Sequence, residues 1–234
     1  MIQVIALLVS YIPAVLLYFY LRNLRKEDKT YTKDCRSLLF KGFTSFICIF
    51  LLSFILNIVW GLLKLDQIHP LLNLAFKNFV LAALAEEVVK YLISASHIRK
   101  KEEGVSWLDM IAFTGIVGLG FHILESIVYF FSTNLIQILV RGITSTHCAY
   151  GMLIGYYMGK AKKSGRKLDV LPGILIAVFL HGMYDFSLAD ELTEISDIFI
   201  FLPFLMAAIG LVVLVRMILL IRRKRNDPEF TTPL

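Results

Sequence analysis

The sequence predicts an all-α protein, a polytopic transmembrane bundle of about seven helices. Hydrophobic residues make up 58 % of the 234 residues, and the mean hydropathy is +0.73. A soluble domain has only roughly 45 to 50 % apolar residues. The apolar residues also gather in blocks of about 20, the length of a helix that crosses a bilayer. The segments between the blocks alternate in charge, as in membrane proteins with short loops.

The spans follow from these blocks, and their orientation follows from the loops. We predict spans at residues 2–21, 38–63, 71–96, 109–131, 135–159, 170–188 and 197–221. The first block is followed by a basic cluster and has no basic residue before it, which indicates an uncleaved first span. Basic segments at 22–36, 99–101, 160–167 and 222–225 alternate with segments that are not basic, at 66–69, 132–134 and 190–197. The positive-inside rule then predicts the N-terminus outside and the C-terminus inside.

Short loops and the lack of an internal repeat favour a single integral-membrane domain, residues 1–225. We expect residues 226–234 to form a short cytoplasmic tail without fixed structure. The net charge of +6 belongs to the cytoplasmic face in this arrangement, next to anionic lipid headgroups, and it requires no nucleic-acid partner. Three cysteines without a Cys-x-x-Cys pair indicate no disulfide framework.

Two adjacent carboxylates, Glu86 and Glu87, interrupt the predicted span 71–96. A charge at the bilayer centre costs roughly 2.5 to 3.5 kcal/mol, so idle acids are rare there. Glu86 lies four residues before Lys90 on one helical face, whereas Glu87 points about 100° away. One lysine cannot fully neutralise both acids, which suits acid and base chemistry. The alternative is a structural ion pair between helices.

Further polar residues lie near the middle of later spans: Glu125, His147, His181 and Asp185. His181 and Asp185 are four apart and share a helical face. Glycines beside Glu125 and His147 allow helices to approach closely. Because successive helices alternate in direction, these groups can meet in one polar pocket at mid-membrane depth.

Four other positions are less informative. His122 fits a satisfied core histidine at least as well as a catalytic one. Arg141 either anchors a carboxylate or reaches the headgroups near a helix end. His69 and His97 fall in predicted loops and are interpreted as surface residues.

Glutamates and histidines around a membrane cavity can activate water, with a carboxylate taking the proton and histidine stabilising the oxyanion. Peptide hydrolysis is the reaction this predicts. The sequence has no His-Glu-x-x-His zinc helix and no Gly-x-Ser-Gly loop. Tyr184 and Asp185 lack the Gly-x-Gly-Asp partner of an aspartyl site, so serine and aspartyl mechanisms lack their parts.

These motifs resemble those of the PrsW-type intramembrane proteases, related to type II CAAX prenyl proteases and bacteriocin-immunity proteins. The resemblance rests on EExxK, FxxxE, a histidine in the next helix and HxxxD, which are Glu86, Glu87, Lys90, Phe121, Glu125, His147, His181 and Asp185. In the CAAX branch the first motif normally ends with Arg one position later, and the second ends with His. Lys90 and Glu125 therefore favour the PrsW branch.

The resemblance implies a protease of the bacterial plasma membrane that makes the first cut in a single-pass, membrane-anchored anti-sigma factor, on its extracytoplasmic side, under envelope stress. Glu86 would be the general base, and Glu87 its partner paired to Lys90. Glu125 would hold the water. His181 with Asp185 would bind the carbonyl or stabilise the oxyanion, and His147 would support the site.

The residues leave the metal question open. Zinc or another divalent metal, if present, would be held by Glu86, Glu125, His147 and His181. Adjacent glutamates with a lysine partner favour the metal-free form, but the sequence commits to neither form, and a divalent metal remains an alternative. The alternatives are a CAAX-type prenyl-protein endopeptidase, a non-catalytic binding or immunity protein and, less favoured because repeat symmetry is lacking, a proton-coupled transporter.

Overall fold

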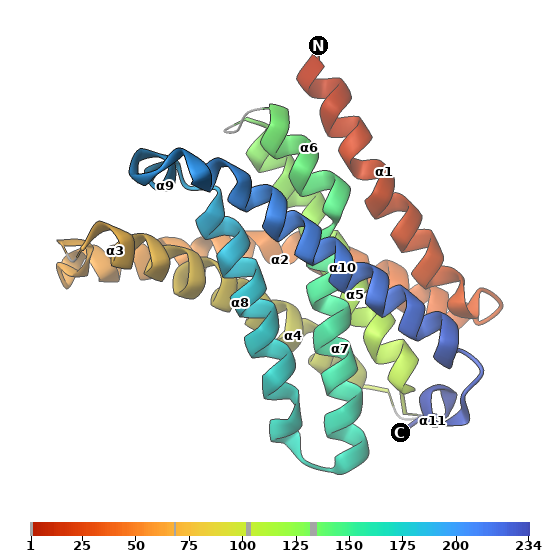
Figure 1. Ribbon diagram of the computed structural model, residues 1–234. Helices are drawn as coiled ribbons and strands as arrows, with labels where there is room; N and C mark the ends of the chain where they lie inside the picture. Colours follow the sequence, from red (N-terminus) through yellow and green to blue (C-terminus); the bar gives the residue numbers. More distant parts are fainter. Residues whose placement is uncertain (1, 68, 102–103, 132–134) are drawn as a thin grey trace.

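The computed structural model describes residues 2–67, 69–101, 104–131 and 135–234, and these residues are almost entirely helical (Figure 1). The α-helices are α1 Ile2–Arg22, α2 Lys29–Leu62, α3 Pro70–Phe76, α4 Ala85–Arg99, α5 Trp107–Phe130, α6 Leu135–Thr144, α7 Thr146–Ser164, α8 Leu171–Ser187, α9 Asp190–Ile195, α10 Leu202–Lys224 and α11 Pro228–Thr231. Short 3-10 turns lie at η1 Asn23–Arg25, η2 Leu65–Gln67, η4 Lys167–Val170 and η5 Asp197–Phe201, and a π-helical segment at η3 Lys77–Leu84.

Within the described residues, five helices are long and apolar enough to cross a membrane. They are Ile2–Arg25, Lys29–Leu62, Trp107–Phe130, Lys167–Ser187 and Asp197–Lys224. The prediction of an all-helical membrane protein is confirmed. The two other predicted spans, 71–96 and 135–159, are helical as well, but neither is a single regular α-helix.

Helix α5 is the centre of the bundle. Its residues from Trp107 to His122 are buried, and it packs between α2 and α7 (Figure 1). A β-carbon on Gly118 would lie 2.1 Å from the His147 carbonyl oxygen of α7, and one on Gly120 would lie 2.1 Å from the Leu39 carbonyl oxygen of α2. The predicted close approach at these glycines is confirmed, and it brings the backbone of His147 against α5.

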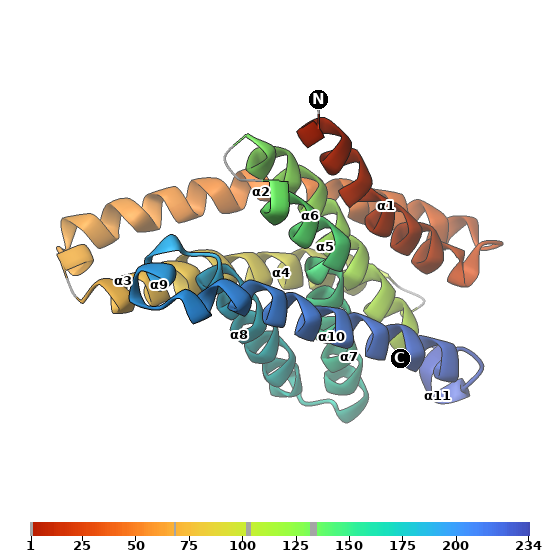
Figure 2. The ribbon, with the colours of Figure 1, turned by 45° about the horizontal axis from the view of Figure 1, so that its top comes forward.

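The predicted span 71–96 is one continuous helical run in which a π-helical segment separates two α-helices. Helix α3 passes into η3 and then α4 without leaving helical backbone angles. Trp60 near the end of α2 stacks on Phe76 with ring centroids 3.5 Å apart and donates a hydrogen bond to Asn73. Figure 2 shows α3 at the far end of α2, from where the run returns to the bundle. The π-helical segment ends at Leu84, two residues before Glu86.

The predicted span 135–159 is interrupted, which corrects the expectation of a single helix. Ser145 has φ of 42°, a left-handed conformation that ends α6 and lets α7 begin in a new direction. Helix α6 packs against α1, where a β-carbon on Gly142 would lie 2.0 Å from the β-carbon of Ser10. Helix α7 packs instead against α5.

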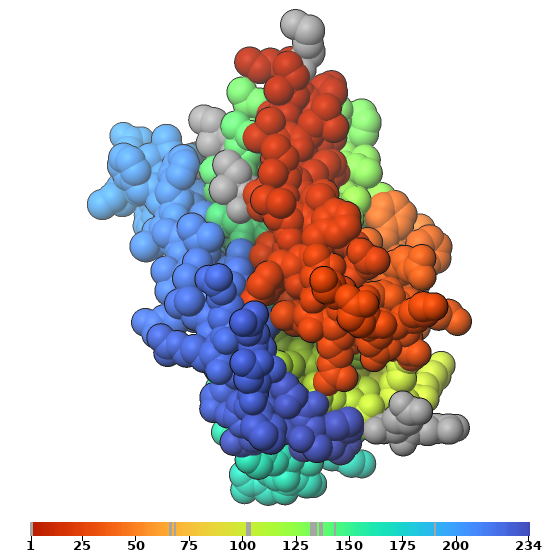
Figure 3. Space-filling model, turned by 90° about the vertical axis from the view of Figure 1, so that its right-hand side faces the viewer, coloured from red at the N-terminus to blue at the C-terminus, as the bar shows by residue number. Residues whose placement is uncertain are grey.

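The last residues are ordered, contrary to the expected unstructured tail. They form α11 and fold back on the bundle, and Figure 3 shows the end of the chain, in dark blue, against the rest of the molecule. Phe230 is buried because its ring stacks on Trp107, at 4.4 Å between centroids. The Leu234 amide also donates to the Val105 carbonyl.

Of the two histidines predicted to be loop residues on the surface, only His69 is one in the structure. His69 is exposed and caps α3, as expected of a surface residue. His97 lies in the last turn of α4 rather than in a loop. Its Nε2 is 3.2 Å from the Asp34 carboxylate of α2, and its side chain is only 11 % exposed, so it helps to join these two helices.

Candidate active site

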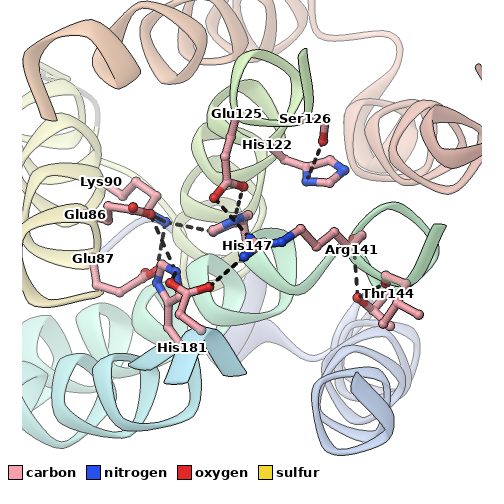
Figure 4. A network of polar contacts seen from close by, with 12 residues as sticks. Glu86, Glu87, Lys90, His122, Glu125, Ser126, Arg141, Thr144, His147 and His181 are labelled. Carbon is pink, nitrogen blue, oxygen red and sulfur yellow. Dashed lines mark hydrogen bonds and ion pairs between the residues drawn. The ribbon is translucent and has the colours of Figure 1, made fainter. Parts of the chain in front are cut away.

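The adjacent glutamates lie in the first turn of α4, where they share one lysine (Figure 4). The Lys90 ammonium is 2.8 Å from Glu87 Oε1 and 3.6 Å from Glu86 Oε2. Both ion pairs are present, but the shorter distance is to Glu87, three residues before Lys90, and not to Glu86, four residues before it. The side chains of Glu87 and Lys90 are fully buried, so this ion pair is shielded from solvent.

His147 connects this pair to α5. Its Nδ1 lies 3.0 Å from the Lys90 ammonium, and its Nε2 lies 2.6 Å from Glu125 Oε2. An ammonium can only donate, so Nδ1 accepts and a neutral ring carries its proton on Nε2. His147 then donates that proton to Glu125, and the two contacts together fix the orientation of the ring.

His181 of α8 faces three carboxylates. Its Nδ1 is 2.9 Å from Glu87 Oε1, and its Nε2 is 3.1 Å from Asp185 Oδ2 and 3.6 Å from Glu86 Oε2. Its ring meets that of His147 edge to face, with centroids 5.0 Å apart. The structure therefore brings together all the predicted site residues, from α4, α5, α7 and α8. Figure 4 labels each of them except Asp185.

Arg141 of α6 completes the cluster, although the sequence left its role open. Its Nη2 lies 3.2 Å from Asp185 Oδ1, and its Nη1 lies 3.5 Å from Glu125 Oε1. The guanidinium points into the bundle rather than toward the headgroups. Charge balance was the signal available in the sequence, because four buried acids need more cation than Lys90 alone supplies.

The two adjacent glutamates have different surroundings. The Oε2 atoms of both glutamates are buried without a hydrogen-bond partner, but Glu87 is held through its Oε1 by Lys90 and His181. The Glu86 side chain is 11 % exposed, more than Glu87, Glu125 or Asp185. A buried carboxylate oxygen without a hydrogen bond is uncommon and indicates a position for water, substrate or an ion.

Two groups of donors are close enough together to hold a metal ion. One is Glu86, His147 and His181, and the other is His122, Glu125 and His147; within each group the ligand atoms lie within 4.8 Å of one another. The sequence predicted that Glu86, Glu125, His147 and His181 would hold one metal together. In the structure Glu125 instead belongs to the donor group that contains His122. His122 Nε2 is buried without a hydrogen-bond partner, which the sequence could not show.

Glutamates, histidines and two basic side chains at the buried centre of a helical membrane bundle mark a functional polar site within a membrane protein. The comparisons define it further. The chain belongs to the PrsW family, because the family model described as PrsW family intramembrane metalloprotease matches residues 35–221. With its relatives in bacteria, given next, the molecule is a multi-pass bacterial membrane protein of an intramembrane protease family.

Proteins named Protease PrsW are among its relatives. The protein of Clostridioides difficile (strain 630) is 30 % identical over 195 residues, which cover 79 % of each chain. That of Geobacillus kaustophilus (strain HTA426) is 32 % identical, over 49 % of this chain and 52 % of its own. That of Bacillus subtilis (strain 168) is 31 % identical, over 56 % and 61 %. No solved structure gives a significant match.

Proposed function

We propose that this protein is an intramembrane endopeptidase that cuts a single-pass membrane protein with water activated by Glu86. The observation that supports this assignment is the Glu86 Oε2 atom, buried without a hydrogen bond and 3.6 Å from His181 Nε2. A carboxylate oxygen with free lone pairs can accept a proton from water. A neighbouring imidazole can then donate to the oxyanion that forms on the attacked carbonyl.

In this mechanism the water oxygen forms a bond to the scissile carbonyl carbon, and its proton passes to Glu86. The carbonyl π electrons move to oxygen, where His181 stabilises the charge. When the C–N bond breaks, Glu86 returns the proton to the leaving amine. Glu87 holds His181 through Nδ1, so Nε2, which lies 3.1 Å from Asp185 Oδ2 without a hydrogen bond, can face the oxyanion. Glu125 holds His147. Lys90 limits the negative charge beside the base.

The donor set also fits a divalent metal. Among the described site residues, four carboxyl groups face two permanent cations, Lys90 and Arg141, and a divalent ion would offset the excess. A metal between His122, Glu125 and His147 would replace the proton that His147 Nε2 donates to Glu125 and would leave Glu86 and His181 free for the roles above, so we place it there rather than in the other donor group. A divalent cation supplies Lewis-acid polarisation of the scissile carbonyl. This placement departs from the metal-free interpretation of the sequence.

We propose the orientation and substrate on the basis of the charge pattern and the family. The runs α3–η3–α4 and α6–α7 each count as one crossing, which gives seven, with the N-terminus outside and the C-terminus inside. Residues 1–225 form the protease domain, and residues 226–234 lie on the cytoplasmic side. The substrate is a membrane-anchored anti-sigma factor, cut on its extracytoplasmic side during envelope stress.

The test uses the purified protein in nanodiscs with a panel of single-pass, envelope-facing substrates. Glu86→Gln should lower the cleavage rate by about 100-fold or more, the range that general acid and base catalysis supplies, while the helical content stays that of the wild type. Glu27→Gln, on an exposed side chain outside the site, is the matched control and should cleave normally. Equal rates in wild type and a folded Glu86→Gln variant would disprove the role of Glu86.

Metal content, measured by elemental analysis, tests the placement of the ion. We expect metal in the wild type, its loss in His122→Gln, and its retention in His181→Gln. Loss in His181→Gln with retention in His122→Gln would move the ion to the group with Glu86. Cleavage by a preparation that contains no metal and resists chelators would favour the metal-free mechanism instead.

A further inference from the structure

Arg141 contacts the two carboxylates that hold the two histidines of the site. One oxygen of Glu125 lies near Arg141 and the other near His147, at 3.5 and 2.6 Å. Asp185 repeats the pattern, with one oxygen near Arg141 and the other near His181, at 3.2 and 3.1 Å. Figure 4 shows the guanidinium of α6 reaching in toward the residues of α5 and α7.

We propose that Arg141 is a positioning residue, which sets the orientation of His147 and His181 by holding the carboxylate that lies beside the Nε2 atom of each ring. The inference rests on the proposed function, since it concerns the rings that serve the reaction. A planar guanidinium suits this task because its fixed fork can direct separate N–H groups to two acids, whereas an ammonium acts as a point charge.

The Arg141 side chain is itself held in place by its neighbours. Its guanidinium lies over the Tyr129 ring, 3.9 Å from the centroid, and its side chain is only 12 % exposed. The next residue, Gly142, allows α6 to approach Ser10 of α1 closely. The turn at Ser145 then separates α6 from α7, so the arginine and His147 reach the site from two helices with different directions.

Removal of the guanidinium would leave Glu125 and Asp185 buried with one partner fewer. Each carboxylate would turn toward its remaining donors, and the attached imidazole would turn with it. A misplacement of about 1 Å can cost about 100-fold in rate when reacting groups must be aligned. Arg141 touches no reacting atom in this arrangement, so its loss should lower kcat much more than it changes KM.

The experiment compares wild type, Arg141→Gln, Arg141→Lys and the control Arg25→Gln in nanodiscs. Arg25 also pairs with a buried acid, Asp109 at 3.1 Å, but at another place in the bundle. Arg141→Gln should lower kcat by about 100-fold with less than about a threefold change in KM. Arg141→Lys keeps the charge without the fork and should recover part of kcat, and Arg25→Gln should change neither constant.

Nitrogen NMR of ¹⁵N-histidine in the same proteins gives a readout that does not depend on cleavage. The ring signals of His147 and His181 should shift in Arg141→Gln, while those of His69 and His97 stay in place. Unchanged His147 and His181 signals would overturn the proposal, and so would a loss of activity that only follows the unfolded fraction. If wild type cleaves nothing, the proposed function fails, yet the ring signals still test whether Arg141 orients the histidines.

Discussion

The Lys90 ammonium lies in a fully buried position among three groups of the site. It contacts Glu87 and Glu86 in its own helix and His147 of α7, and it lies 4.4 Å from the centroid of the Phe121 ring. A buried ion pair adds little net stability, but removal of one partner leaves an uncompensated charge in a medium of low dielectric constant. The main effect of Lys90 on stability is therefore that it compensates the buried carboxylate charges beside it.

Replacement of Lys90 by Met should destabilise the protein by about 3 to 5 kcal/mol, the usual cost of breaking a buried pair from one side. Addition of Glu87→Gln should restore part of that stability, because the charge closest to the missing ammonium is then gone while Glu86 keeps its charge, and activity should stay lost. Arg166→Met, which breaks an exposed pair with Asp169, is the control and should leave stability unchanged. Equal stability of the single and double variants, measured by unfolding in mixed detergent, would contradict this account.

At the scale of single residues, the sequence predicted which acids and histidines meet. Ionisable side chains in the middle of a membrane span are costly in free energy and are usually functional, so Glu86, Glu125, His147 and His181 could be grouped without coordinates. It did not predict that Lys90 lies closer to Glu87 than to Glu86. Spacings of three and four both allow a contact, and His181, which binds the same oxygen of Glu87, is near only in the folded chain.

At the scale of helices, hydropathy predicted where apolar segments lie but not how the backbone winds within them. The segment 144–146 read as a polar stretch inside one span, whereas Ser145 is in fact the end of one helix and the start of another. The π turns before Glu86 were invisible for the same reason, because an apolar run has the same composition in either winding. Both irregularities border the site, where π segments and strained residues are often found.

Ser145 offers a test of that irregularity. A left-handed conformation costs a non-glycine residue roughly 1 to 2 kcal/mol. Ser145→Gly should keep activity and gain up to about 1 kcal/mol of stability, part of the strain relief being offset by the greater freedom of glycine in the unfolded chain. Ser145→Val should lose about 2 kcal/mol and much of the activity, because the turn that places His147 is then disfavoured. Equal melting temperatures for the two variants would show that this turn stores no strain.

At the scale of the whole molecule, the fold depends on α5, which is buried on nearly all sides and carries Glu125. The glycines that allow this burial were visible in the sequence, and so was the membrane character of the helices. The order in the C-terminal residues was not, since a short polar segment after a span is commonly unstructured. It arises from contacts with residues that are distant in the chain, such as Arg25, whose Nη2 donates to the Thr231 carbonyl.

The same C-terminal segment yields a prediction about how the helices are held together outside the membrane. Water, rather than lipid, surrounds this part in the proposed orientation, so burial of Phe230 against Trp107 gains from the hydrophobic effect. Phe230→Ala should lower the stability in detergent by about 3 kcal/mol. Phe40→Ala makes the same chemical change at an exposed position of α2 and should cost much less. Because Phe230 packs on Trp107 at the start of α5, far along that helix from Glu125, the folded Phe230→Ala variant should still cleave at the wild-type rate at low temperature. A reduced rate in the fully folded variant would mean that the segment also controls the site, whereas unchanged stability would mean that its contacts do not hold the bundle together.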